Sequence, residues 1–192
     1  MNLDDYLPPA PRQPQNRFWW PMQIFDDSVI PLVPYSDERL DTDFELHCLY
    51  DCGAIKDADV EHWDRSDFNV GLLCGSVSGV TVLEVTSRSA QHWLDEQDLP
   101  CTPQWLCRRS RCYLFCGPEL AQPITELRRG VRLLSTGAHV TLPGSIYDDG
   151  RLVYWEASPD DFEIQDLPSW LIPPEALLAN PPTVVAACDR AN

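Results

Sequence analysis

The stretch that decides the fold is NVGLLCGSVSGVTVLEVTSR, residues 69–88. Two apolar runs flank a turn of glycine and serine, and the second run ends in one acid, Glu84, followed by Thr86. Side chains two residues apart on a strand project from the same face, so Glu84 and Thr86 are expected to face one site. Two carboxylates at these positions would suit a metal site, so the threonine is the residue to explain.

The composition of the 192 residues is that of a folded, acidic protein. A hydrophobic fraction of 44% and seven tryptophans predict a buried core, and no apolar run has the length of a membrane span. The formal net charge of -16 argues against broad, non-specific attraction to nucleic acid or anionic lipid. Between Cys101 and Arg132, however, six arginines stand against two glutamates, which gives +6 - 2 = +4. This segment predicts a local basic site on an acidic body.

Eight cysteines raise the question of disulfides or zinc. None has the C-x-x-C spacing, and the pairs Cys48–Cys52 and Cys112–Cys116 match zinc spacing only loosely. Cys74, Cys112 and Cys116 lie in apolar, strand-like runs, where buried free thiols are common. We therefore expect reduced cysteines, no zinc, and a cytoplasmic location.

Composition divides the chain into three parts. Both ends are rich in proline, and the sequence between them contains no internal repeat. We expect a flexible Pro-rich arm at 1–16, one folded domain at 17–172, and a Pro/Ala-rich tail at 173–192.

The patterns of the middle domain predict many strands and few helices, which is an α+β fold. Pro31 and Pro34 place the first strand, at 28–36, at a sheet edge, because proline cannot donate a ladder hydrogen bond. The turn at 76–79 predicts a hairpin between its flanking strands. A helix is expected to begin near Ser87 or Ser89 and to end before Pro100. The other expected elements are a short helix at 57–64 and strands at 103–109, 111–117, 130–136, 138–144 and 151–157.

Two common enzyme motifs are missing from the sequence. The only lysine, Lys56, neither follows a glycine nor precedes a serine or threonine, so no phosphate-binding P-loop is present. No G-x-S-x-G nucleophile elbow is present either.

The order of the remaining motifs resembles that of the N-terminal primase-polymerase domain of bifunctional DNA primase/polymerases, in the archaeo-eukaryotic primase superfamily. The similarity extends from about Val29 to Trp170. It implies a mostly antiparallel or mixed sheet, flanking helices and a central cleft. The matching segments are NVGLLCG (69–75), VLEVT (82–86), SRCYLF (110–115), GVRLLSTGAHV (130–140) and TLPGSI (141–146).

The resemblance also implies a site in which three acids hold two divalent metals and a histidine helps to bind the incoming triphosphate. The first acid falls on Glu84, the second on Thr86 and the third on Arg132, while the histidine falls on Cys112. One acid of three remains, so Glu84 is a weak metal ligand and Arg132 can pair with it. The resemblance thus implies a degenerate DNA primase/polymerase-like domain of a plasmid, phage or other mobile element, with no cofactor, or Mg²⁺ or Mn²⁺ if active.

Arg109, Ser110 and Arg111 are candidates for binding nucleotide or phosphate, because guanidinium groups match phosphate oxygens well. The alternative is an exposed basic turn without a ligand. Any nucleotide or DNA binding is expected to be weak and salt-dependent, with a replication protein as a candidate partner and no membrane.

Two other functions stay open on the sequence alone. One is an active metal-dependent nucleotidyltransferase with a rearranged site, in which Asp148, Asp149 or Glu156 replaces the lost ligands; otherwise these are solvated surface acids. The other is a protein-binding module with no nucleic-acid role. An unpaired acidic cluster near Glu84 would favour the enzyme, and an ion-paired pocket would favour a module.

Overall fold

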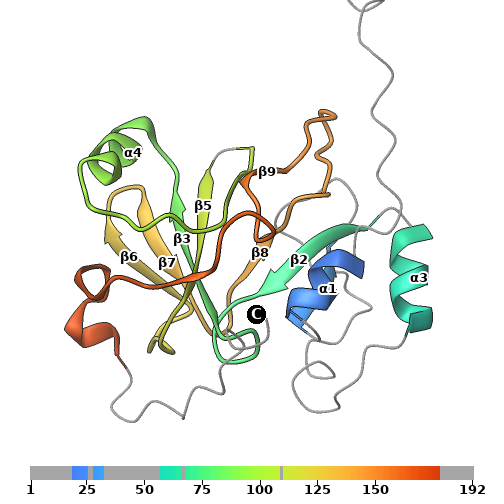
Figure 1. The fold of residues 1–192 in the computed structure, drawn as a ribbon, viewed down its shortest axis with the longest axis horizontal. Coiled ribbons are helices and arrows are strands. Elements are labelled where there is room, and N and C mark those ends of the chain that lie inside the picture. Colours follow the sequence, from blue (N-terminus) through green and yellow to red (C-terminus); the bar gives the residue numbers. More distant parts are fainter. Residues whose placement is uncertain (1–18, 26–27, 33–56, 66–67, 109, 178–192) are drawn as a thin grey trace, which may run out of the picture.

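The fold is described by a computed structural model, which covers residues 19–25, 28–32, 57–65, 68–108 and 110–177. Two sheets, one of three strands and one of seven, carry a few short helices, which confirms the α+β class (Figure 1). The pairing is antiparallel except where β10 joins β5. No helix in these ranges is both long and apolar enough to cross a membrane.

The smaller sheet has the strand order β1-β2-β8, and the larger has the order β6-β7-β3-β5-β4-β9, with β10 beside β5. The strands of the smaller sheet are β1 (Val29–Leu32), β2 (Asn69–Leu73) and β8 (His139–Thr141). Those of the larger sheet are β6 (Ile124–Arg128), β7 (Val131–Leu134), β3 (Val80–Val85), β5 (Arg111–Cys116), β4 (Gln104–Leu106), β9 (Tyr154–Ala157) and β10 (Gln165–Asp166). The helices are α1 (Trp19–Phe25), α3 (Asp57–Arg65), α4 (Arg88–Asp95) and the short 3-10 helices η3 (Ser169–Leu171) and η4 (Pro174–Ala176).

Several expected elements are confirmed. β1 lies at the edge of the smaller sheet, where the missing N–H of Pro31 is tolerated. α4 begins at the expected cap, because the Ser87 hydroxyl accepts a hydrogen bond from the Ala90 N–H at 3.2 Å. Helix α3 and the strands β4 and β5 are also present, and the two strands pair with each other.

The prediction of a hairpin between β2 and β3 is wrong. The two strands belong to different sheets and meet only at the bridge between Gly75 and Val80, where the Gly75 N–H donates to the Val80 carbonyl at 2.7 Å. Both edges of each strand already have partners, so neither strand has a free edge for the other. Gly75 has a φ of +87°, and Thr136 lies 2.1 Å from where a Cβ would be, so this crossing point requires glycine.

One buried side chain ties the smaller sheet to a distant segment. The Asn69 amide donates to the Ile146 carbonyl at 3.0 Å and accepts from the Ile146 N–H at 2.9 Å. The Ser145 hydroxyl accepts from the Val70 N–H at 2.8 Å. The first and last motifs of the sequence resemblance are therefore bonded to each other, which explains why an asparagine is needed in a strand that is otherwise apolar.

The two faces of the larger sheet bury different side chains, because neighbouring residues on a strand point to opposite faces. On one face, Val82 and Leu114 pack with apolar residues of β2 and β8. On the other face, Leu83 and Phe115 pack with α4 and with the chain around η3 and η4. Figure 1 shows α4 at one end of the view and β2, α1 and α3 at the other.

The expected domain boundaries fall partly outside the described residues. The arm at 1–16 and residues 178–192 of the tail lie outside them. The fold continues past the boundary expected at residue 172, because Ala176 is buried and Leu177 forms a bridge with Leu120.

The expectation of reduced cysteines is wrong at one position. Cys116, at the end of β5, is disulfide-bonded, and its partner is not among the described residues. Cys74 and Cys112 are free and fully buried.

Candidate functional site

A row of four polar side chains crosses the larger sheet at one level. Glu84 on β3 lies opposite Cys112 on β5 and opposite Arg132 on β7. Arg132 in turn lies opposite Glu126 on the edge strand β6. Residues directly opposite each other on antiparallel strands share a face, so all four side chains project from the same side of the sheet.

The centre of this row is an ion pair. The Arg132 Nε–H donates to Glu84 Oε2, and the two side chains are 43% and 12% exposed. The hydrogen bond to Glu84 raises the pKa of the Arg132 guanidinium above its ordinary value, and the more distant Glu126 acts in the same direction. The carboxylate expected to hold a metal is thus already neutralised by a neighbouring side chain.

A cavity of about 660 Å³ lies over the row, between the larger sheet and β8. Glu84, Arg132 and Ser110 line its large-sheet side, and Thr86, which follows the end of β3, lies exposed among its lining residues. His139 of β8 lies on the opposite wall. Strands β3 and β7 therefore bring Glu84, Thr86 and Arg132 to one cavity, as the motif order predicted.

Cys112 lies in the same row but is fully buried beneath the cavity. Its neighbour Cys107 lines the cavity in its place. A hydrogen bond between the two thiols lowers the pKa of Cys107 and, together with burial, raises the pKa of Cys112. The position expected to match a histidine thus holds a buried, protonated thiol.

The basic β4–β5 hairpin is held by acids of the turn that precedes β9, the strand beside β4. Arg108 forms ion pairs with Asp148 at 2.9 Å and with Asp149 at 3.2 Å. The Arg151 side chain bonds to Asp149 as well, at 2.6 Å, and lowers the pKa of that carboxyl. The two aspartates expected as alternative metal ligands are therefore exposed acids paired with arginines.

Of the three residues expected to bind phosphate, the two that the structure describes, Ser110 and Arg111, do not converge. Ser110 lines the large cavity, whereas Arg111 lies on the opposite face, in a second cavity of about 380 Å³ beside α4. Arg111 pairs there with Glu156 at 2.7 Å. Burial lowers the pKa of Arg111, but the bond and charge of Glu156 more than offset this. Arg109 lies outside the described residues.

Two residues of this face were not expected from the sequence. His139 is half-buried in the cavity wall, and burial lowers its pKa because the charged form loses its hydration. Glu126 completes the row at the sheet edge. The segment ITELR (124–128) has no regular apolar alternation, so no sequence signal marked Glu126; in the structure its residues alternate between exposed and half-buried.

The fold and the row of motifs define a protein of the primase-polymerase type. The sequence matches the family described as "Bifunctional DNA primase/polymerase, N-terminal" over residues 28–170, which is most of the chain. The chain belongs to this family. No curated protein matches the sequence.

The donor atoms of the site do not fit the pair of divalent cations that the family implies. Glu84 is bonded to a guanidinium, and Glu126 lies two strand spacings away, roughly 10 Å. Thr86 has no charge, and among the described residues no three His, Cys, Asp or Glu side chains are grouped as metal ligands. Two-metal sites need several anionic oxygens around both cations, and this row offers only Glu84, which already has a partner, and the distant Glu126.

Proposed function

We propose that the chain is a catalytically degenerate primase-polymerase domain of the replication machinery of a plasmid, phage or other mobile element. It does not transfer nucleotides through a metal pair, and it acts by binding nucleic acid or nucleotide, or by assembling with a replication partner. The bond between Arg132 and Glu84 carries the proposal, because it puts a permanent positive charge at the position of a metal-binding acid.

The electrostatic cost of this substitution is large. Two unit charges 4 Å apart repel by about 4 kcal/mol at an effective dielectric of 20. A cation next to Glu84 would meet this repulsion from Arg132, which corresponds to a loss of metal affinity on the order of a thousandfold. The neutral Thr86 and the buried thiol of Cys112 supply nothing to offset it.

The alternative of an active enzyme with a rearranged site finds little support in the remaining acids. Asp148 and Asp149 are held by Arg108, and Glu156 is held by Arg111 on the other face of the sheet. Each acid that was a candidate replacement ligand therefore has an arginine partner and lies outside the set of residues that line the large cavity.

Primer synthesis and primer extension with Mg²⁺ and with Mn²⁺ test the proposal directly. We expect no incorporation by the purified protein, with an intact member of the family as the positive control. Incorporation that is abolished by Glu84→Ala would overturn the proposal.

The triple variant Thr86→Asp, Cys112→His and Arg132→Asp is the complementary test. It restores the residue types of the family at all three substituted positions, so metal binding should return before any activity does. A variant that stays folded, as judged by circular dichroism, and binds no Mn²⁺ would show that the loss lies outside these positions.

A further inference from the structure

The arginines of the described residues fall into two groups. Five of the eight have a carboxylate partner, and three do not. The three without a partner, Arg88, Arg128 and Arg129, all lie at one place, where the β6–β7 turn meets the start of α4. A guanidinium without a bound acid keeps its full capacity to bind phosphate.

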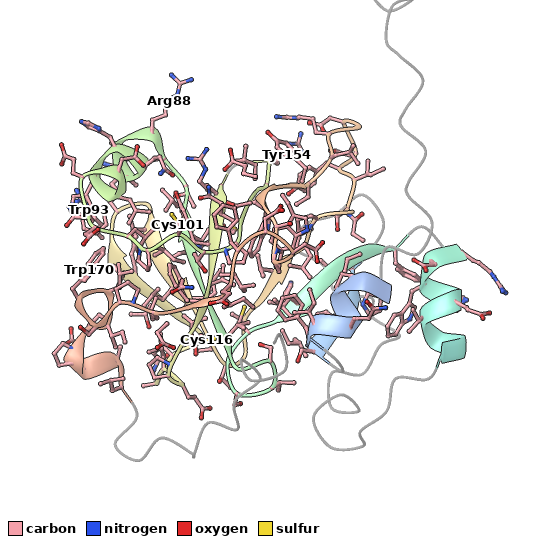
Figure 2. All side chains as sticks on the ribbon, in the orientation of Figure 1. Arg88, Trp93, Cys101, Cys116, Tyr154 and Trp170 are labelled. Atoms are coloured by element: carbon pink, nitrogen blue, oxygen red, sulfur yellow. The ribbon has the colours of Figure 1, made fainter. Side chains whose placement is uncertain are left out.

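Contacts between the turn and the helix hold these arginines together. Gly130 follows Arg129, and its carbonyl accepts from the Thr86 N–H at 2.9 Å. A Cβ at Gly130, where φ is +80°, would lie 2.9 Å from the Ser87 hydroxyl. Arg88 is the next residue, and Figure 2 shows its side chain projecting away from the body of the protein. The positive end of the α4 dipole lies at the same point.

Two tryptophans extend this cationic region along the surface. The Arg128 guanidinium lies 4.5 Å from the centre of the Trp93 ring, which is a cation–π contact. The Trp93 ring meets the Trp170 ring edge-on at 6.2 Å, and Trp170 is 46% exposed (Figure 2). The arginine–tryptophan strip, as we call it, is made of Trp170, Trp93, Arg128, Arg129 and Arg88.

We propose that the arginine–tryptophan strip is a binding site for single-stranded nucleic acid. An exposed indole stacks on any base, and guanidinium groups contact the backbone phosphates, which is how proteins hold single strands without reading their sequence. The cationic end of the strip adjoins Thr86 on the lining of the cavity, so a bound strand would lead toward it. This inference rests on the nucleic-acid role in the proposed function and locates it outside the cavity.

Fluorescence anisotropy with a labelled oligothymidylate tests the strip. Arg88→Gln, Arg128→Gln and Arg129→Gln together should weaken binding at least tenfold at low salt. Each phosphate contact on a single strand contributes about 0.7 to the slope of log K against log salt, so the slope should fall by about 2.

The matched control is the triple variant Arg65→Gln, Arg108→Gln and Arg151→Gln, which removes the same charge from arginines that have acid partners. It should bind as the unmodified protein does. Equal losses in the two triple variants would overturn the strip, because they would show that overall charge alone sets the affinity.

Trp170→Ala tests the stacking, with Tyr154→Ala as an aromatic control that is 53% exposed on β9. The tryptophan variant should lose about tenfold in affinity, in the range for one base stacked on an aromatic ring, and the tyrosine variant should lose nothing. An unchanged Trp170→Ala overturns the stacking role.

Three further outcomes separate the strip from the proposed function. Absence of any oligonucleotide binding at low salt would overturn the strip and leave the primer-extension result as it stands. Binding to anionic lipid vesicles that depends on Trp170 and competes with the oligonucleotide would overturn the strip as a nucleic-acid site. Primer extension by the unmodified protein would overturn the degenerate site while leaving the strip intact, because the strip does not include Glu84.

Discussion

The cavity and the arginine–tryptophan strip use arginine in opposite ways. In the cavity, Arg132 is half-buried and forms an ion pair with Glu84 on the neighbouring strand β3. In the strip, Arg128 rests on an indole ring, and Arg129 has no carboxylate partner within the described part of the chain. Arg132, Arg128 and Arg129 all come from the segment that carries a net +4 in the sequence. Charge counted along the chain therefore does not tell which charge is available to a ligand.

The largest expected effect concerns metal binding at the cavity. Arg132→Asp removes the repulsion and places a third carboxylate between Glu84 and Glu126, so Mn²⁺ affinity should rise on the order of a thousandfold. Arg129→Asp makes the same charge change in the strip and should leave Mn²⁺ affinity nearly unchanged. Electron paramagnetic resonance titration of Mn²⁺ measures both. Equal affinities in the two variants would remove the distinction between the regions.

The next effect concerns stability. Arg132→Ala leaves the Glu84 carboxylate 12% exposed without its cation, and should lower the free energy of unfolding by about 2 kcal/mol, less than for a fully buried pair. Arg129→Ala breaks no ion pair and should cost less than about 0.5 kcal/mol. Urea denaturation gives both values. Adding Glu84→Gln to Arg132→Ala should recover most of the loss, and a double variant no more stable than the single one would contradict the pairing.

The smallest effect concerns pH. Burial lowers the pKa of His139 below its unfolded value of about 6.5, so the unfolded chain binds a proton more readily in the window just below that pH. The free energy of unfolding should therefore decrease as the pH drops below about 6.5, and above that pH His139 should cause no loss. His139→Gln should remove this part of the acid sensitivity of Tm, whereas His92→Gln, on the exposed face of α4, should not. The same slope in both variants would assign the effect to other groups.

The parts of the fold that the sequence predicted are those with strong local patterns. β3, β5 and α4 each combine a clear apolar period with a turn or cap, such as Ser87 before α4. β6 was missed because ITELR has no regular apolar alternation, and at the sheet edge its residues are exposed or only half-buried. The hairpin between β2 and β3 was wrong because Gly75 and Gly79 mark a reversal of the chain, and a reversal does not say whether the strands then share a sheet.

The candidate site was likewise predicted only where local patterns determine it. Glu84, Thr86 and Arg132 follow from the order of motifs, because strand register carries them to one face. The partners of Arg108 and Arg111 lie 40 and 45 residues away in the sequence, and no local pattern connects them. The basic segment predicted a local cationic site that includes Arg128 and Arg129, but not which arginines stay free of acid partners, because those partners are distant in the sequence.

The bond between Asn69 and Ile146 has a consequence for building chimaeras from members of this family. The two ends of this bond are 77 residues apart in the chain, with the Glu84–Arg132 pair lying between them. An exchanged segment that ends inside this interval takes residue 69 from one parent and residue 146 from the other. If residue 69 is then not an asparagine, the buried backbone N–H and carbonyl of residue 146 lose their hydrogen-bond partner. Asn69 and Ile146 therefore mark the limits of the smallest block that can be exchanged as a unit, and that block contains all four residues of the row: Glu84, Cys112, Glu126 and Arg132.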